Sequence, residues 1–171
     1  KREDSVDIYA RLFNTNGSPA STEFQINSGT NVSVCASPSV APSGDGGFIV
    51  AWMQRDLQEA GNSWDIFARP VSGMGYKGTE RRVNTHVYGD QLGPKVSAVN
   101  STYLVVWTSM AQDGSGNGVY GQLLASDGAL SAGEFRVNAT TPSEQMHAVV
   151  ASDGVAAFLT VIGYSVNDTI V

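Results

Sequence analysis

The segment Asp113-Gly114-Ser115-Gly116-Asn117-Gly118 places oxygen-bearing side chains at alternate positions between glycines. Carboxylate, hydroxyl and amide oxygens are the ligands that Ca²⁺ takes, so Asp113, Ser115 and Asn117 form a candidate calcium site. A twelve-residue helix-loop-helix calcium loop is excluded, because Leu124 stands where that loop needs its bidentate Glu. The alternative, which the sequence favours, is a glycine-rich connection between strands that binds no ion.

Acceptor motifs for N-linked glycans, Asn-x-Ser/Thr, are the second group of residues with evident chemistry. Five occur, whereas random placement of the chain's Asn, Ser and Thr predicts roughly two. Their asparagines are Asn16, Asn31, Asn100, Asn138 and Asn167. We expect these residues in loops, between repeat units or at a strand end, carrying glycans on a secreted or cell-surface protein.

The chain has few residues of the types used in nucleophilic catalysis or in transition-metal binding. Two histidines, His86 and His147, and one cysteine are too few for a zinc site or a nucleophilic dyad. Cys35 has no partner for an intrachain disulfide. It is expected to be a small buried side chain, with a disulfide to another chain as the alternative. The sequence therefore predicts no catalytic residue, no metal-dependent enzyme and no cofactor other than the candidate Ca²⁺.

The acidic residues follow a repeating pattern that favours a structural role. Glu23, Glu80 and Glu134 stand at equivalent places in three similar segments. A glycosidase needs one pair of carboxylates at a fixed separation, and a residue that recurs in every unit is more simply explained by holding that unit together. One predicted partner for these glutamates is the pair of arginines Arg11 and Arg69.

Composition excludes several classes of partner. The net charge is -6 with a pI near 4.7, and no dense cluster of Lys and Arg is available for a nucleic-acid backbone. No run approaches the roughly 18 apolar residues of a membrane-spanning helix, and the first residues are not followed by a signal-peptide core. We therefore expect no nucleic-acid partner and no membrane span.

The elements that position these residues belong to a repeat of 53 to 58 residues, a period typical of stacked or radially arranged units. The equivalent segments are residues 7–11, 65–69 and 118–122; 23–27, 80–84 and 134–138; and 48–52, 103–107 and 156–160. In the last of these, Thr160 takes the place of the tryptophan found in the first two copies.

Four short strands are predicted in each unit. They are 94–99, 102–108, 118–124 and 133–138 in one unit, and 38–41, 47–53, 64–71 and 79–84 in the preceding one. The second strand of each is continuously apolar, which favours burial on both faces, so Trp52 and Trp107 are predicted to pack between sheets. The fourth strand alternates, which is typical of a half-exposed outer strand. Turns ending in Gly17, Gly75 and Gly128 are predicted between the third and fourth strands, and residues 53–60 are expected to form a loop.

This arrangement predicts an all-β chain of β-propeller-like blades with four antiparallel strands each. Three segments carry a resemblance: Gly46-Gly47-Phe48-Ile49-Val50-Ala51-Trp52, Gln112-Asp113-Gly114-Ser115-Gly116, and Gly133-Glu134-Phe135-Arg136-Val137-Asn138. They resemble the propeller-type repeats of large secreted surface proteins, in which Gly-Phe-Val-Val-x-Trp, Gln-Asp-Gly-x-Gly and Glu-Phe-x-Val-Asn follow one another. Only residues 92–138 carry all three pieces. The resemblance implies the fold and an extracellular setting, and it implies no catalytic residue.

Strand counting divides the chain into two complete blades, 31–87 and 88–142, flanked by two half-blades. Residues 1–30 would supply the third and fourth strands of a blade, and residues 143–171 the first and second. A half-blade leaves an unpaired edge that invites another strand. The chain is then a fragment of a larger propeller, a small closed ring, or a unit that pairs with copies of itself in a ring or a filament.

The leading functional hypothesis is a non-catalytic, extracellular structural glycoprotein that assembles head to tail by completing blades between chains. The alternative is a carbohydrate- or protein-binding, lectin-like propeller from a larger secreted surface protein. A glycosidase-like propeller is the third hypothesis.

Overall fold

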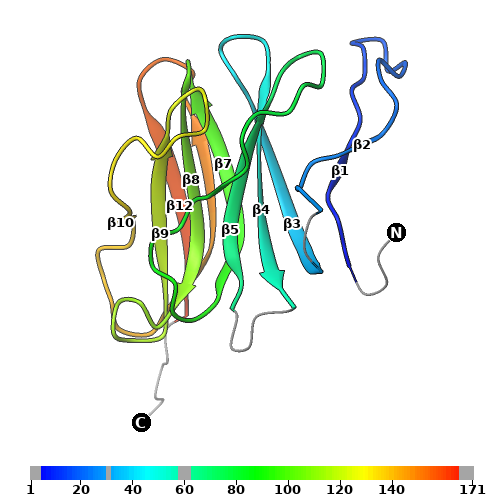
Figure 1. The fold of residues 1–171 in the computed structure, drawn as a ribbon. Helices are drawn as coiled ribbons and strands as arrows, with labels where there is room; N and C mark the ends of the chain where they lie inside the picture. The colour runs from blue at the N-terminus through cyan, green and yellow to red at the C-terminus, as the bar shows by residue number, and fades with distance from the viewer. Residues whose placement is uncertain (1–4, 30–31, 58–62, 166–171) are drawn as a thin grey trace.

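The computed structural model describes residues 5–29, 32–57 and 63–165, which form strands, turns and loops without a helix. Figure 1 shows the strands arranged in sheets that stand side by side. Two sheets have four strands, in the orders β3-β4-β5-β6 and β10-β9-β8-β7, and two have a single antiparallel pair, β1-β2 and β11-β12. Neighbouring strands are consecutive in the sequence, as expected when hairpins connect them. The prediction of an all-β chain is confirmed.

The strands have the following bounds: β1 (Tyr9–Ala10), β2 (Phe24–Gln25), β3 (Ser33–Pro42), β4 (Phe48–Asp56), β5 (Asp65–Val71), β6 (Arg81–Arg82), β7 (Gln91–Val99), β8 (Thr102–Met110), β9 (Asn117–Leu124), β10 (Phe135–Arg136), β11 (Glu144–Ser152) and β12 (Phe158–Ser165). Each of the eight strands predicted for the two central units overlaps one of these. The expected loop at 53–60 is wrong for its first part, because Met53 to Asp56 continue β4 by pairing with the start of β3. Residues 58–60 lie outside the described residues.

One turn geometry recurs between the third and fourth strands of successive units. Gly17, Gly75 and Gly128 have φ angles of 82°, 85° and 77°. The N–H of each glycine donates to the backbone oxygen of the residue three positions earlier. A side chain at these positions would strain the backbone, so glycine ends each turn and the sequence-based turn prediction is confirmed.

A second recurring feature was not predicted. The first strands β3, β7 and β11 each change register, between Ala36 and Ser39, Leu92 and Lys95, and Met146 and Val149. The residue at each irregularity, Ser37, Gly93 or His147, has a positive φ of 52°, 60° or 57°. Such bulges bend a strand and increase its twist, so all three units bend their first strand at the same place.

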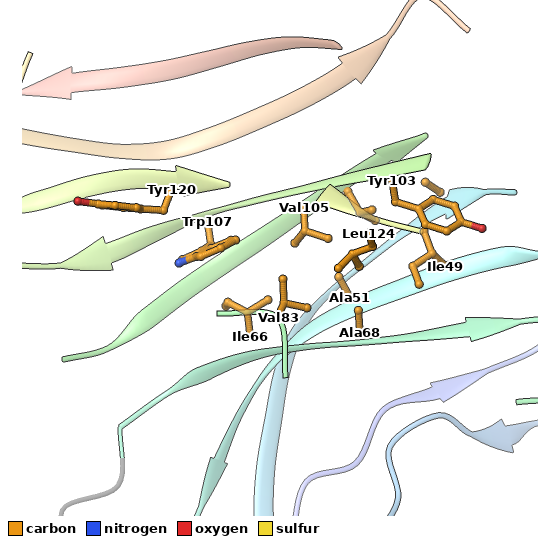
Figure 2. Packing of buried hydrophobic residues seen from close by; sticks show 12 residues of the cluster. Ile49, Ala51, Ile66, Ala68, Val83, Tyr103, Val105, Trp107, Tyr120 and Leu124 are labelled. Carbon is orange, nitrogen blue, oxygen red and sulfur yellow. The ribbon is translucent and has the colours of Figure 1, made fainter. Parts of the chain in front are cut away.

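Apolar clusters lie between successive sheets, in the order of the chain. One contains Ile8, Trp52 and neighbours, where β1-β2 contacts the β3–β6 sheet. The largest joins the two four-stranded sheets, with Tyr103, Val105 and Trp107 of β8 facing side chains of the preceding sheet (Figure 2). The third joins β8 and β9 to β11-β12. Trp52 and Trp107 are fully buried, which confirms that they pack between sheets.

The last unit requires one correction of alignment. Ser152 pairs with Phe158 as Pro42 pairs with Phe48, so Phe158 is the structural equivalent of Phe48. Ile162 therefore occupies the tryptophan position, and the assignment of Thr160 to it was wrong by two residues. The sequence alignment missed this because the turn residues before Phe158 are themselves small and apolar.

Candidate assembly surfaces

The asparagine that ends each fourth-strand segment holds its unit together. Asn27, Asn84 and Asn138 are each 2% exposed. Their Oδ1 atoms accept the backbone N–H of Ile8 at 2.9 Å, of Ile66 at 2.7 Å and of Val119 at 2.8 Å. Each asparagine thus replaces a missing backbone partner beside a two-residue outer strand, which satisfies a buried donor.

The same geometry involves one of the predicted glycosylation sites, Asn138. The Nδ2 atom of Asn138, to which a glycan would be joined, donates to the oxygen of Thr140 at 2.8 Å and to Oε1 of Gln145 at 3.1 Å. In the folded chain both N–H groups of the Asn138 amide are therefore engaged, and glycosylation at Asn138 remains a prediction. Asn16 and Asn100 are exposed in turns, where glycosylation remains a prediction. Asn31 and Asn167 lie outside the described residues.

Two glutamates, Glu80 and Glu134, link neighbouring sheets by accepting hydrogen bonds from the residue that follows the repeated asparagine of the preceding unit. Glu80 Oε2 accepts the N–H and hydroxyl of Ser28 at 2.7 and 2.9 Å. Glu134 Oε2 accepts the N–H and hydroxyl of Thr85 at 2.6 and 3.1 Å. Hydrogen bonds to a carboxylate are stronger than neutral ones, so these links fix the spacing of adjacent sheets at their outer edge.

The predicted Arg–Glu pairing is present in one unit only. Arg69 lies 3.5 Å from Glu80 and also donates to the backbone oxygen of Ile26. Arg11 instead donates to the Ser21 oxygen at 3.1 Å, so its pairing with a glutamate is wrong. Glu23 is exposed, and in the described part of the chain it makes neither a hydrogen bond nor an ion pair.

The indole N–H of each buried tryptophan has its own acceptor. Trp107 donates to Oε1 of Gln91 at 2.9 Å. The position of Gln91, two residues before the bulge, is taken by Cys35 in the preceding unit. There Trp52 donates to Gln54 instead, at 3.1 Å. Cys35 is buried and unbridged, and burial raises the pKa of its thiol to about 11. It matches the expectation of a small buried side chain.

Of the candidate calcium residues, Asp113 and Ser115 lie in the loop between β8 and β9, and Asn117 is the first residue of β9. Asp113 Oδ1 accepts the N–H of Ser115 at 3.1 Å, and its Oδ2 is buried without a hydrogen-bond partner. The loop is also held from the next unit, because Glu144 Oε2 accepts the N–H of Asn117 at 2.9 Å. Within residues 5–29, 32–57 and 63–165, no three acidic, His or Cys side chains gather as metal ligands. Calcium binding by Asp113, Ser115 and Asn117 remains a prediction.

An apolar groove of about 360 Å³ opens beside β1, between the β1-β2 pair and the faces of β3 and β4. Pro38, Val40, Phe48 and Val50 form its floor. Val40 is 61% exposed there, whereas Val96, at the equivalent position one unit later, is only 7% exposed. The difference arises because the inner strands of the preceding sheet cover Val96, and no described strand covers Val40.

The opposite end of the stack has the complementary surface. Leu159 and Val161 of β12 are 67% and 55% exposed. Their equivalents in β8, Leu104 and Val106, are 6% and 0% exposed, because the β11-β12 pair packs on them. One face of the last sheet therefore carries side chains of the same type and spacing as those buried between sheets elsewhere.

Both ends also leave strand edges unpaired among the described residues. The order β11-β12 ends at β12, whereas β8 in the neighbouring sheet continues to β9. Just before β1, the N–H of Ile8 donates to Asn27 and its C=O accepts from Ile26, so both groups point toward β2. Because backbone groups alternate along a strand, the N–H and C=O of Tyr9 point toward the opposite edge, away from β2. An edge of this kind is a template for another strand.

A hollow of about 340 Å³, whose lining surface is mostly apolar, lies between the turns of the two central units. Asp45, Tyr76, Tyr103 and Asp127 are among the side chains that line it. The Tyr103 hydroxyl donates to Ser43 Oγ at 2.5 Å, and burial raises the pKa of Tyr103. Carboxylates beside an exposed aromatic ring, here Tyr76, provide both polar and apolar contacts for a small ligand.

The comparisons with known proteins add one short match. The family model described as protein export membrane protein SecD/SecF, C-terminal, matches residues 141–171. This segment contains β11 and β12 and is much less than half of the chain, so the match does not place the chain in that family. No curated protein matches the chain. Among the described residues there is no helix with the length and hydropathy required to cross a bilayer.

Proposed function

We propose that this chain is a non-catalytic, extracellular structural module whose units are β-propeller-type blades, and that copies assemble head to tail by completing blades between chains. The observation that carries the proposal is the matched pair of end surfaces. In the described part of the chain, the end at β1 has a groove and no inner strands, and the end at β12 has an apolar face and no outer strands. Each end thus supplies what the other lacks.

Blade-type packing is supported by the meander order of the two four-stranded sheets and by clusters that join each sheet to the next. The recurring bulge in each first strand supports units of one shape. Identical contacts repeated end to end produce a heterologous interface, which gives a ring when the rotation closes and a filament when it does not.

The extracellular part of the proposal is supported by the excess of glycan acceptor motifs. Asn16 and Asn100 are exposed in turns and belong to none of the apolar clusters, so glycans there would project into solvent. Expression in a secreting eukaryotic host should add mass that a glycosidase removes, and replacing both asparagines by Gln should reduce the added mass. A product without glycans would contradict this part of the proposal.

Assembly is tested by multi-angle light scattering and sedimentation of the purified chain over a wide concentration range. We expect a mass that rises with concentration in multiples of the 18.0 kDa chain. A monomer that stays folded at the highest concentrations would overturn the assembly proposal. Electron microscopy then separates rings from filaments.

The hollow between the turns of the two central units supports a second candidate function, the binding of carbohydrate or of a polar peptide. Its exposed Tyr76 and the carboxylates of Asp45 and Asp127 suit a ligand with both hydroxyls and an apolar face. A glycan array tests this candidate, with Tyr76→Ala as the variant. Binding that Tyr76→Ala leaves unchanged, or no binding at all, would remove it.

A further inference from the structure

The contacts between units inside the chain define how a second copy would fit. In the complete sheets, the second and third strands pair in one register, with Ala51 opposite Ala68 and Val106 opposite Gly121. Val161 is the equivalent of Ala51 and Val106, because Phe158 is the equivalent of Phe48 and Tyr103. The partner residues on the third strands, Ala68 and Gly121, each lie two residues after the residue whose backbone N–H donates to the repeated asparagine.

That donor is Ile8 in the first unit, Ile66 in the second and Val119 in the third. Ala10 is therefore the equivalent of Ala68 and Gly121. We propose that β12 of one copy pairs antiparallel with β1 of a second copy, Val161 opposite Ala10, so that Leu159 and Val161 fill the groove of the second copy. This inference rests on the proposed head-to-tail assembly and specifies its register.

The chain itself shows what covers such a surface. Between the two four-stranded sheets, Ile49 and Ala51 pack with Val96, Tyr103 and Val105 in one buried cluster. The same positions at the two ends are Leu159 and Val161 on one side, and Val40, Phe48 and Val50 on the other. Aliphatic side chains meet aliphatic and aromatic ones in both cases, so a second copy is the occupant whose chemistry matches the groove. In strand addition of this kind, main-chain hydrogen bonds provide affinity, and pockets for alternate side chains provide specificity.

A polar contact in the same register involves Glu23. Glu80 and Glu134 each accept the N–H of the residue that follows the repeated asparagine in the preceding unit, Ser28 and Thr85. The next residue in this series is Ala139, which is exposed. Glu23 of the second copy would therefore accept the N–H of Ala139, which gives the free carboxylate a partner.

Engineered cysteines test the register in the full chain with Cys35→Ala, so that no native thiol competes. One preparation carries Ala10→Cys and another carries Val161→Cys, and the two are mixed under mild oxidation. Directly opposed Cα atoms lie about 4.5–5.5 Å apart, within disulfide range. In the control, a preparation with Leu12→Cys replaces the one with Ala10→Cys. In the proposed register residue 12 is a diagonal neighbour of residue 161, about 7–8 Å away, which is too far for a disulfide without movement of the backbone.

We expect covalent dimers from Ala10→Cys with Val161→Cys at least tenfold in excess over the Leu12→Cys mixture. Light scattering of the same chains without oxidant reports assembly independently. Assembly without this cross-link would overturn the register and leave the proposed function standing. Absence of assembly in every preparation, with the native chain also monomeric, would overturn both.

A charge placed in the groove gives a second, non-covalent test. Leu159→Glu should weaken self-association at least tenfold, since the carboxylate would be buried against Val40 and Val50. Tyr88→Glu is the control, because Tyr88 is 78% exposed in the connection between β6 and β7 and does not line the groove. Equal effects of the two variants, with both still folded by circular dichroism, would overturn the placement of Leu159 in the groove.

Discussion

The contact between the two four-stranded sheets and the two ends of the stack are built from the same residue positions. Val96 in that contact, and Leu104 and Val106 between β8 and the β11-β12 pair, are nearly or fully removed from solvent. At the ends, their equivalents Val40, Leu159 and Val161 are more than half exposed. The comparison teaches that the apolar character of a position in this chain is set by the unit, whereas its burial is set by the neighbouring unit, as in other stacked repeat proteins.

The largest expected effect is at Leu104, the buried equivalent of the exposed Leu159. Leu104→Ala should lower the free energy of unfolding by about 2–5 kcal/mol, because it leaves a cavity between β8 and β11. Leu159→Ala should change it by less than about 0.5 kcal/mol in the monomer. Urea unfolding at low concentration, followed by tryptophan fluorescence, measures both variants. Similar losses from the two would show that the last sheet is covered in the isolated chain.

The repeated asparagine gives the next largest effect. Asn84→Ala leaves the buried N–H of Ile66 without an acceptor and should cost about 1–3 kcal/mol of unfolding free energy. Asn16→Ala, at an exposed turn, is the control and should cost under about 1 kcal/mol. The same unfolding experiment compares them. A loss at Asn16 as large as that at Asn84 would contradict the structural role of the repeated position.

The next prediction compares Glu134, which links two sheets within the chain, with its equivalent Glu23 in the first unit. Glu134→Ala removes the acceptor for two donors of Thr85 and should cost about 1–2 kcal/mol. Glu23→Ala should leave the stability of the monomer unchanged and weaken only self-association. Unfolding at low concentration and light scattering at high concentration separate these two outcomes. A stability loss from Glu23→Ala in the monomer would mean that Glu23 already has a partner within the chain.

The smallest effect concerns the turn of the last sheet, which is held by hydrogen bonds more than by packing. Asp153 Oδ1 accepts the N–H of Ala157, Val155 and Ala156, and these bonds lower the pKa of its carboxyl group. A lowered folded-state pKa adds stability above the unfolded-state pKa of about 3.9, and this stability is lost as the pH falls through the folded-state value. Asp153→Asn should therefore make the loss of stability in acid shallower. Melting temperatures between about pH 2 and 6 test this, and unchanged acid sensitivity would contradict it.

The sequence was sufficient for the strands and the turns, because period, β-branched runs and repeated glycines act locally. Gly17, Gly75 and Gly128 were found in this way, and so were both buried tryptophans. The bulges were not found, because Ser37, Gly93 and His147 share no residue type and only their backbone angle is common. The signal available was the Pro that follows Ser37 and Gly93.

The surfaces were harder to predict than the fold. The Asn-x-Thr motif at Asn138 could not reveal the hydrogen bonds of its amide, because their partners Val119 and Gln145 lie 19 and 7 residues away. Strand counting pointed to two open ends, but the groove beside β1 depends on the relative position of two sheets. Cys35 stands at the position of Gln91, and Gln54 accepts the indole N–H of Trp52 in its place. This exchange of acceptors depends on side-chain geometry that no repeat alignment contains.

The burial of Cys35 has a practical consequence for following the motions of this chain. A thiol with a pKa near 11, enclosed between β1-β2 and the β3–β6 sheet, does not react with thiol reagents in the closed state. Its labelling rate then reports how often this one contact opens, without any added probe. Compared with the melting of the whole chain, that rate measures whether the β1-β2 pair detaches on its own before the rest of the stack unfolds.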